Sequence, residues 1–148
     1  MTLPEVLLSE ERRESVVADC VVLVDSEVQK RGGVSGFAIK GGYKVVKRLD
    51  SGKMVPKMVN DLLPEFASAF EPFHQEFRGG AATSFAAHTE GRHAELAESL
   101  LAITDGKAVH AKNSVLKKVY AKLRPSAKKN LLDSMPAITR LVDQHAPK

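Results

Sequence analysis

The sequence is short of the residue types that many binding sites depend on. Among its 148 residues there are two tyrosines, one cysteine and no tryptophan. The scarcity of aromatic rings argues against a carbohydrate site and against a platform on which nucleic-acid bases stack. The one cysteine, Cys20, has no partner for an internal disulfide and lies among valines. We therefore expect a buried, unreactive thiol, which fits a reducing compartment.

Long hydrophobic runs and targeting signals are also missing. No apolar run approaches the ~20 residues that a membrane-spanning helix needs. The opening MTLPEVLLSEERRE has no basic segment ahead of an apolar one, so we expect no signal peptide. Hydrophobic and charged residues make up 43% and 27% of the chain, which is typical of a globular protein. These features predict one cytoplasmic domain spanning residues 1–148.

Sequence motifs that mark known chemistry are absent. The segment GFAIKGGY at residues 36–43 superficially resembles a phosphate-binding loop, but no Lys-Ser/Thr pair follows its last glycine. His88 and His93 are five residues apart, whereas two metal ligands on one helix face are three or four apart. The i,i+4 carboxylates Glu10 and Glu14 are typical of a solvated helix face. We predict a protein that is not an enzyme, with no catalytic residue, metal site or cofactor.

The positive charge, by contrast, is concentrated in two blocks. The net charge is +4, with 22 basic and 18 acidic residues. Residues 30–57 carry eight basic residues against Asp50 alone, and residues 106–132 carry eight and no acid. Such blocks bind nucleic acid or other anionic surfaces in some proteins, and in others they form ion pairs with acids of the same fold. The sequence leaves both alternatives open.

The first basic block is also rich in glycine and predicts a helix over residues 34–49. One side of this helix would carry Val34, Ala38, Gly41, Gly42, Val45 and Leu49, and we expect this side to pack inward. Because glycine disfavours helix interiors, its presence there indicates a close approach of another backbone. The residues that we expect at such close helix contacts are Gly32, Gly36, Gly41 and Gly42.

The opposite side of this helix gives the candidate interaction surface. Tyr43 would stand at its edge, and lysines of the second block could extend it if the fold brings the two blocks together. The predicted surface comprises Lys40, Tyr43, Lys44, Lys47, Arg48, Lys117, Lys118 and Lys122.

A stripe of apolar residues between Met58 and Phe77 carries four of the six phenylalanines at spacings of three and four. This spacing is typical of a buried helix face. Pro64 and Pro72 interrupt the stripe, so we expect a break or kink before each. Similarly, we expect a helix to end at Pro125 and another to begin at Pro136. No segment alternates as a strand would, and the sequence predicts a compact all-α bundle of about five to seven helices.

Several of these segments carry a family resemblance. GGVSGFAIKGGYKVVKRL, MVPKMVNDLLPEF and EPFHQEF, with the later LKKVYAKLR and MPAITRLVDQHA, resemble a family of small bacterial proteins known only as a domain of unknown function. The resemblance covers most of the chain. It implies an all-helical intracellular protein and no catalytic or binding residues.

Three functions remain open at this point. We expect a non-catalytic interaction or scaffold protein that uses the basic helix face to bind a protein partner or a second copy of itself. The alternative is a nucleic-acid-associated protein without sequence preference, because lysine rows neutralise phosphates but few amide side chains accompany them to read bases. A second alternative is a small-molecule-binding helical protein, which would need a pocket near the phenylalanine stripe.

Overall fold

The computed structural model describes residues 1–148, and all of its regular elements are helical. The predicted all-α fold with five to seven helices is confirmed. Two short 3₁₀ turns, η1 and η2, accompany seven α-helices. In chain order the elements are α1 (Leu3–Leu7), α2 (Arg13–Lys30), α3 (Gly33–Arg48), η1 (Leu49–Gly52), α4 (Met54–Gly79), α5 (Phe85–His88), η2 (Glu90–Arg92), α6 (His93–Val109) and α7 (Ser114–His145).

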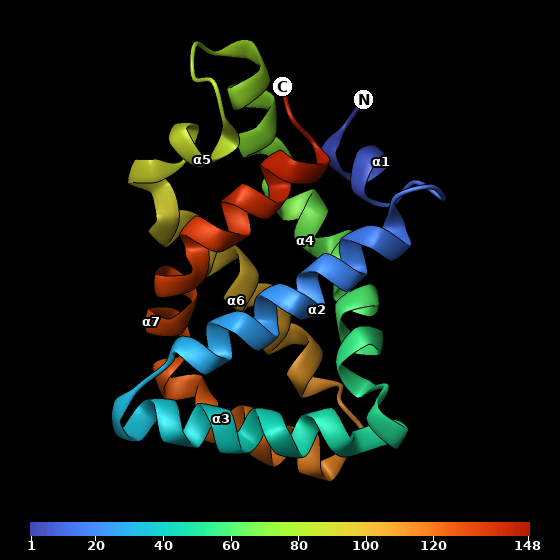
Figure 1. Ribbon diagram of the computed structural model, residues 1–148, viewed down its shortest axis with the longest axis vertical. Helices are drawn as coiled ribbons and strands as arrows, with labels where there is room; N and C mark the ends of the chain where they lie inside the picture. Colours follow the sequence, from blue (N-terminus) through green and yellow to red (C-terminus); the bar gives the residue numbers. More distant parts are fainter.

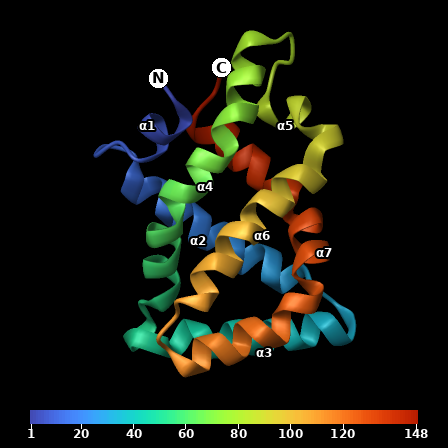
Figure 2. The ribbon, with the colours of Figure 1, turned by 180° about the vertical axis from the view of Figure 1, so that it is seen from behind.

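Four long helices surround the core. α4 and α7 form two sides of the molecule, while α2 and α6 run between them on opposite faces (Figures 1 and 2). α3 lies across one end and packs on α2, α4 and α7. α1 packs on α4 and α5 packs on α7, and both chain ends lie far from α3 (Figure 1).

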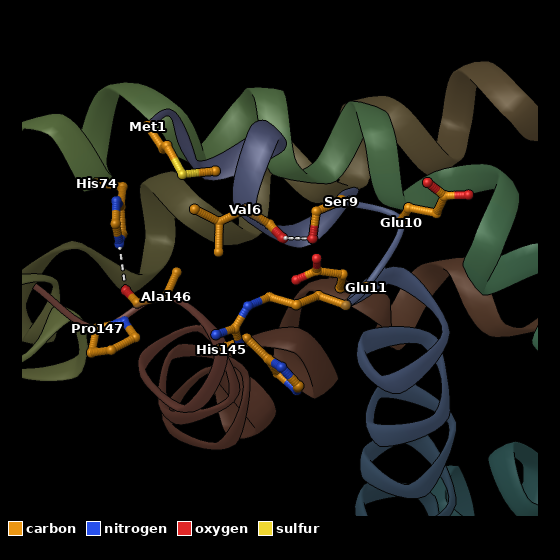
Figure 3. A pocket seen from close by; sticks show the side chains of 10 residues that line it. Met1, Val6, Ser9, Glu10, Glu11, His74, His145, Ala146 and Pro147 are labelled. Carbon is orange, nitrogen blue, oxygen red and sulfur yellow. Dashed lines mark hydrogen bonds between the residues drawn. The ribbon is translucent and has the colours of Figure 1, made fainter.

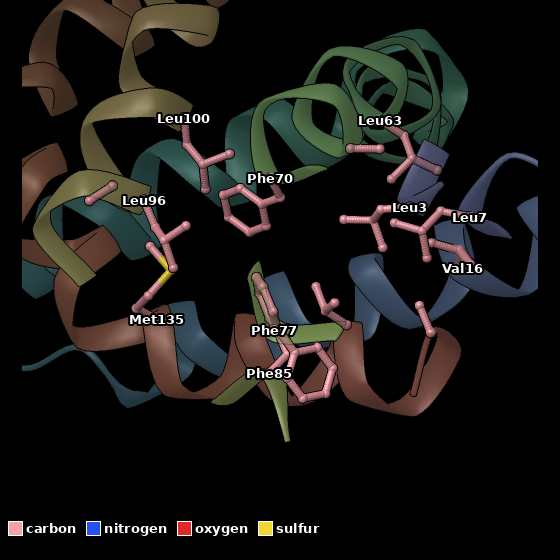
Figure 4. Packing of buried hydrophobic residues seen from close by; sticks show 14 residues of the cluster. Leu3, Leu7, Val16, Leu63, Phe70, Phe77, Phe85, Leu96, Leu100 and Met135 are labelled. Atoms are coloured by element: carbon pink, nitrogen blue, oxygen red, sulfur yellow. The ribbon is translucent and has the colours of Figure 1, made fainter. Parts of the chain in front are cut away.

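The core is centred on the phenylalanine stripe of α4. Leu63, Phe70 and Phe77 are buried along this helix, in the main cluster of the protein. Phe77 meets Phe85 of α5 with ring centroids 6.0 Å apart, and both side chains are fully buried (Figure 4). The predicted stripe is therefore the central ridge of the core. A second, smaller cluster lies beneath α3 and includes Tyr43.

The predicted helix boundaries at Pro125 and Pro136 are wrong, because α7 continues through both, and α4 continues through Pro64 and Pro72 without a break. A proline leaves the carbonyl four residues earlier without its helical partner. At Pro64 this carbonyl belongs to Asn60, and Arg13 of α2 donates to it at 3.1 Å.

The other three prolines, Pro72, Pro125 and Pro136, lie at solvent-exposed positions of their helices. α7 changes direction along its length: its first half follows α3, and its second half turns back toward the termini (Figure 1). A proline within the helix, Pro125, accounts for such a bend. The bend is what brings the second basic block beside the first.

Candidate functional site

α3 is rotated relative to the sequence prediction. Its buried residues are Gly36, Ile39, Tyr43 and Val46, which form the side that faces α2 and the small cluster. Val34, Gly41 and Val45, which were expected to pack inward, are exposed. The predicted packing face is therefore wrong by roughly a third of a turn. The physical reason is that α3 has apolar residues on two sides, and the side with Ile39 and Tyr43 packs inward, where the Tyr43 hydroxyl bonds to α2.

The four glycines expected at close contacts differ in their surroundings. A Cβ on Gly42 would lie 3.1 Å from Val119 and 3.3 Å from Leu123, so α7 approaches α3 closely there. A Cβ on Gly36 would collide with the backbone of Arg31, at the entrance to α3. Gly32 and Gly41 have no atom within 4 Å of the Cβ position, so the predicted close contacts at these two residues are wrong.

α3 and the first half of α7 lie side by side and antiparallel. Gly42 meets Val119 and Leu123, while Arg31, just before α3, reaches Ser134 of α7 at 2.8 Å. Higher numbers on one helix thus face lower numbers on the other. Figure 2 shows the two helices together across the end of the molecule.

This packing defines which residues face outward. The residues where the two helices touch, Gly42, Val119 and Leu123, form the contact row. Tyr43 and Tyr120, each one position after a residue of this row, point toward the core. Because one residue corresponds to about 100° of rotation, residues one position before the row turn the other way, to solvent. On α3 this outward row includes Gly41, and on α7 it includes Lys118 and Lys122. The two outward rows are neighbours, and we call their joint surface the α3–α7 face.

The α3–α7 face has apolar side chains in its middle. Phe37 is 82% exposed and Val34 is 91% exposed, and Val45 continues their row along α3. Val115 of α7 lies exposed near the same end of the face as Val45. The sequence prediction placed Val34 and Val45 inside. An apolar row left in water is a mark of an interaction site in folded proteins.

Unpaired positive charge flanks this row on both sides. The charged residues of the predicted surface that are exposed and have no carboxylate within ion-pair distance are Lys40, Lys44, Arg48, Lys117, Lys118 and Lys122. α3 contains no acidic residue, and α7 contains none before Asp133. The two basic blocks are therefore brought together at one end. By helical spacing, Lys117 points away from the row that carries Lys118 and Lys122.

Two members of the predicted surface have other roles. Tyr43 is buried, and its hydroxyl donates to Asp25 of α2 at 2.5 Å, so its assignment to the surface is wrong. Lys47 forms an ion pair with the same carboxylate at 3.2 Å. The Tyr43 hydroxyl holds the pKa of Asp25 below its usual value. Burial and the carboxylate together raise the pKa of Tyr43. Both residues fix α3 on α2.

Several other basic residues of the two blocks also form ion pairs within the fold. Lys107, Arg124 and Lys128 pair with acids of neighbouring helices, as does Arg31 with Asp133. Glu27 is nearly buried beside Arg31. Burial alone would raise the pKa of Glu27, but hydrogen bonds from Lys30 and Ser134 hold it below its usual value. Part of the basic charge thus stabilises the fold, and the part on the α3–α7 face does not.

One hollow of the molecule lies near the chain ends. It has a volume of ≈ 690 Å³ and lies among α1, the start of α2, α4 and the C-terminal residues (Figure 3). Polar and apolar residues both line it, and both of its histidines are hydrogen-bonded. His74 Nε2 lies 2.9 Å from the Ala146 carbonyl oxygen, and His145 Nε2 lies 2.7 Å from Asp19 Oδ2. These bonds anchor the C-terminal segment rather than point to a reaction.

Three further features bear on possible functions: the single thiol, groups of metal-binding side chains, and helices long enough to cross a membrane. Burial raises the pKa of Cys20 to about 11, so its thiol is protonated at neutral pH. No three histidine, cysteine, aspartate or glutamate side chains are grouped as a metal site would require. None of the helices has both the length and the apolar character needed to cross a membrane.

The fold and this surface define a class: an all-helical protein with one basic, partly apolar end. Residues 3–146 match the model of the Family of unknown function (DUF6918), and the chain belongs to that family. The resemblance found in the sequence is thereby confirmed. No curated protein and no solved structure matches the chain.

Proposed function

We propose that this protein is a non-catalytic interaction domain that binds an anionic partner through the α3–α7 face. The observation that carries the proposal is the arrangement of the two basic blocks. Exposed Phe37 and Val34 are flanked by cations of both blocks that have no carboxylate within ion-pair distance, namely Lys40, Lys44, Arg48, Lys118 and Lys122. Removal of the apolar side chains from water and attraction between opposite charges would both favour binding. We place this function in the cytoplasm, as the sequence suggests.

Chromatography on immobilised heparin, used as a polyanion probe, tests the proposal. Lys44→Gln with Lys122→Gln removes two charges from the α3–α7 face. Arg12→Gln with Arg140→Gln removes two charges from exposed, unpaired positions elsewhere. The first pair should lower the salt concentration needed for elution clearly more than the second, because local charge density governs binding. Equal shifts for both pairs would show that only net charge matters and would contradict the proposal.

A sequence-nonspecific association with nucleic acid is the second candidate function. It is supported by the unpaired lysines on both helices, which could neutralise successive phosphates. The exposed Phe37 and Val34 disfavour it, since phosphates gain nothing from apolar contact. Fluorescence anisotropy with a short duplex and a single strand, at low and physiological salt, measures this binding directly. Binding that is lost with Lys44→Gln and Lys122→Gln would support nucleic acid as the partner.

A further inference from the structure

The apolar row of α3 and the cations beside it form one continuous pattern. Along the outer side of the helix, Val34, Phe37, Gly41 and Val45 follow one another at spacings of three and four. Lys40, Lys44 and Arg48 run along one flank of this row. α7 supplies the other flank through Lys118 and Lys122. The result is an apolar line with positive charge on both sides.

The row lies on the outer side of α3, at one end of the molecule. α3 lies across the end of the fold, and no helix covers its outer side (Figures 1 and 2). The hollows at the chain ends and between α2 and α7 are lined by other residues. A protein helix that docks on an apolar surface usually enters a groove between other helices. A single row of apolar side chains on an uncovered helix is instead suited to a partner that is flat and deformable.

We propose that the α3–α7 face binds the surface of an anionic lipid membrane, with α3 lying in the plane of the headgroups. Phe37, Val34 and Val45 would enter the upper acyl region, and the flanking lysines would contact lipid phosphates. Helices that lie in this position combine an apolar face with lysine or arginine on the polar side, as α3 does. The inference rests on the proposed function, because it names the partner of the same surface.

Charge complementarity favours this occupant over a second copy of the chain. Two copies joined through this face would bring together lysine rows of the same sign, with no acid on either α3. Like charges across an interface oppose association. Nucleic acid would satisfy the lysines and leave the apolar row in water. An anionic membrane satisfies both parts of the surface.

The absence of tryptophan makes the proposal directly measurable. Phe37→Trp introduces a single tryptophan at the centre of the row, at a position that is exposed and so tolerates the change. On vesicles of equal parts phosphatidylcholine and phosphatidylglycerol, its emission should shift to shorter wavelength, and acyl-chain brominated lipid should quench it. Val22→Trp, at an exposed position on α2, is the matched control and should show neither effect.

Flotation of the unlabelled chain provides a second measurement. The wild-type protein should float with the anionic vesicles at low salt and dissociate as salt increases. Phe37→Ser should weaken this binding by about tenfold, because a buried phenylalanine contributes substantially to transfer from water. Circular dichroism checks that each variant keeps its helices.

The outcomes separate this inference from the proposed function. No spectral shift and no flotation at low salt would overturn membrane binding. Flotation of the Phe37→Trp chain without bromine quenching of its tryptophan would overturn it as well. If binding to heparin or a duplex persists in either case, the face still binds anions and only the lipid partner is wrong. If heparin retention is also insensitive to the lysines of the face, the proposed function fails with it.

Discussion

At the scale of single residues, the two tyrosines connect two different pairs of helices in the same way. Each hydroxyl donates a hydrogen bond to an aspartate on the neighbouring helix. Tyr43 of α3 donates to Asp25 of α2, and Lys47, four residues later, pairs with that carboxylate. Tyr120 of α7 donates to Asp105 of α6 at 2.5 Å, and Arg124, four residues later, holds the same acid. Hydrogen bonds from Arg124 and, to a smaller extent, from Tyr120 lower the pKa of Asp105. Each tyrosine thereby fixes one helix of the α3–α7 face on its neighbour.

We expect Tyr43→Phe to lower the free energy of unfolding by about 1 kcal/mol, because the ring stays packed and one hydrogen bond to a charged acceptor is lost. Tyr120→Phe should lower it as well. Because the two hydrogen bonds connect separate pairs of helices, the two losses in unfolding free energy should add in the double variant. Urea denaturation measures all three chains.

Lys44→Gln, next to Tyr43 but facing solvent, is the control and should leave the urea midpoint unchanged. A Tyr43→Phe chain as stable as the wild type would mean that the hydrogen bond to Asp25 adds nothing to the α2–α3 contact.

At the scale of helices, α3 is held more weakly than α4. It contains several glycines in its interior, each of which costs about 1 kcal/mol relative to alanine. Beneath it lies a cluster with only three buried residues, compared with fourteen in the main core. Its stability therefore depends on contacts with α2 and α7 more than on its own sequence.

Adjacent glycines in α3 should respond oppositely to the same substitution. Gly41 is open to solvent, so Gly41→Ala should raise the unfolding free energy by up to about 1 kcal/mol. Gly42→Ala should give no gain or a loss, because the new methyl would lie 3.1 Å from Val119. Thermal and urea unfolding of the two variants measure the difference. Equal stabilisation by both would show that α7 yields easily at Gly42.

The sequence alone could predict the helices but not the rotation of α3. Spacing identified the buried stripe of α4, because its apolar residues lie on one side. In α3, Val34 and Val45 lie on one side and Ile39 and Val46 on another, so the pattern permits either packing. The choice depends on tertiary contacts, such as Tyr43 with Asp25. The two basic blocks, together with Phe37 between lysines in a segment without acids, were the signals available in the sequence for the α3–α7 face.

At the scale of the whole molecule, the fold unites charge that the chain separates. Lys44 and Lys122 belong to different blocks, and the antiparallel packing of α3 on α7 places them on opposite flanks of one face. The sequence left open whether the blocks are joined or neutralised. Both occur, since Lys47 and Arg124 bind acids while Lys44 and Lys122 do not. Long-range pairing of this kind has no local signature.

The stability of the whole chain should decline in acid in two stages. Burial has the largest effect on His74 and lowers its pKa. The hydrogen bond with Ala146 opposes it, the charge of Arg78 lowers the pKa further, and Glu71 and Asp143 raise it slightly. The unfolded chain therefore takes up this proton first, below the ordinary histidine pKa of about 6.5. Stability from His74 is complete above that pH and is lost as the pH falls toward the lowered value in the folded state.

A second decline should follow below about pH 4, where Asp25, Glu71 and Asp105, whose pKa values are lowered in the folded protein, become protonated. Urea unfolding as a function of pH measures both stages. His74→Gln should remove the first stage and leave the second, while His110→Gln, at an exposed position, should keep both. A first stage that survives in His74→Gln would assign it to another histidine.

The placement of the chain ends has a consequence for how the protein could be linked to others. Both termini lie far from α3 (Figure 1). The last residue, Lys148, donates a hydrogen bond to the carbonyl of Ala82 at 2.9 Å, which holds the C-terminus at that end of the molecule. A polypeptide fused to either end would leave the α3–α7 face unobstructed. On a bilayer it would project away from the lipid, so the molecule could serve as an oriented tether that holds a fused cargo above the surface.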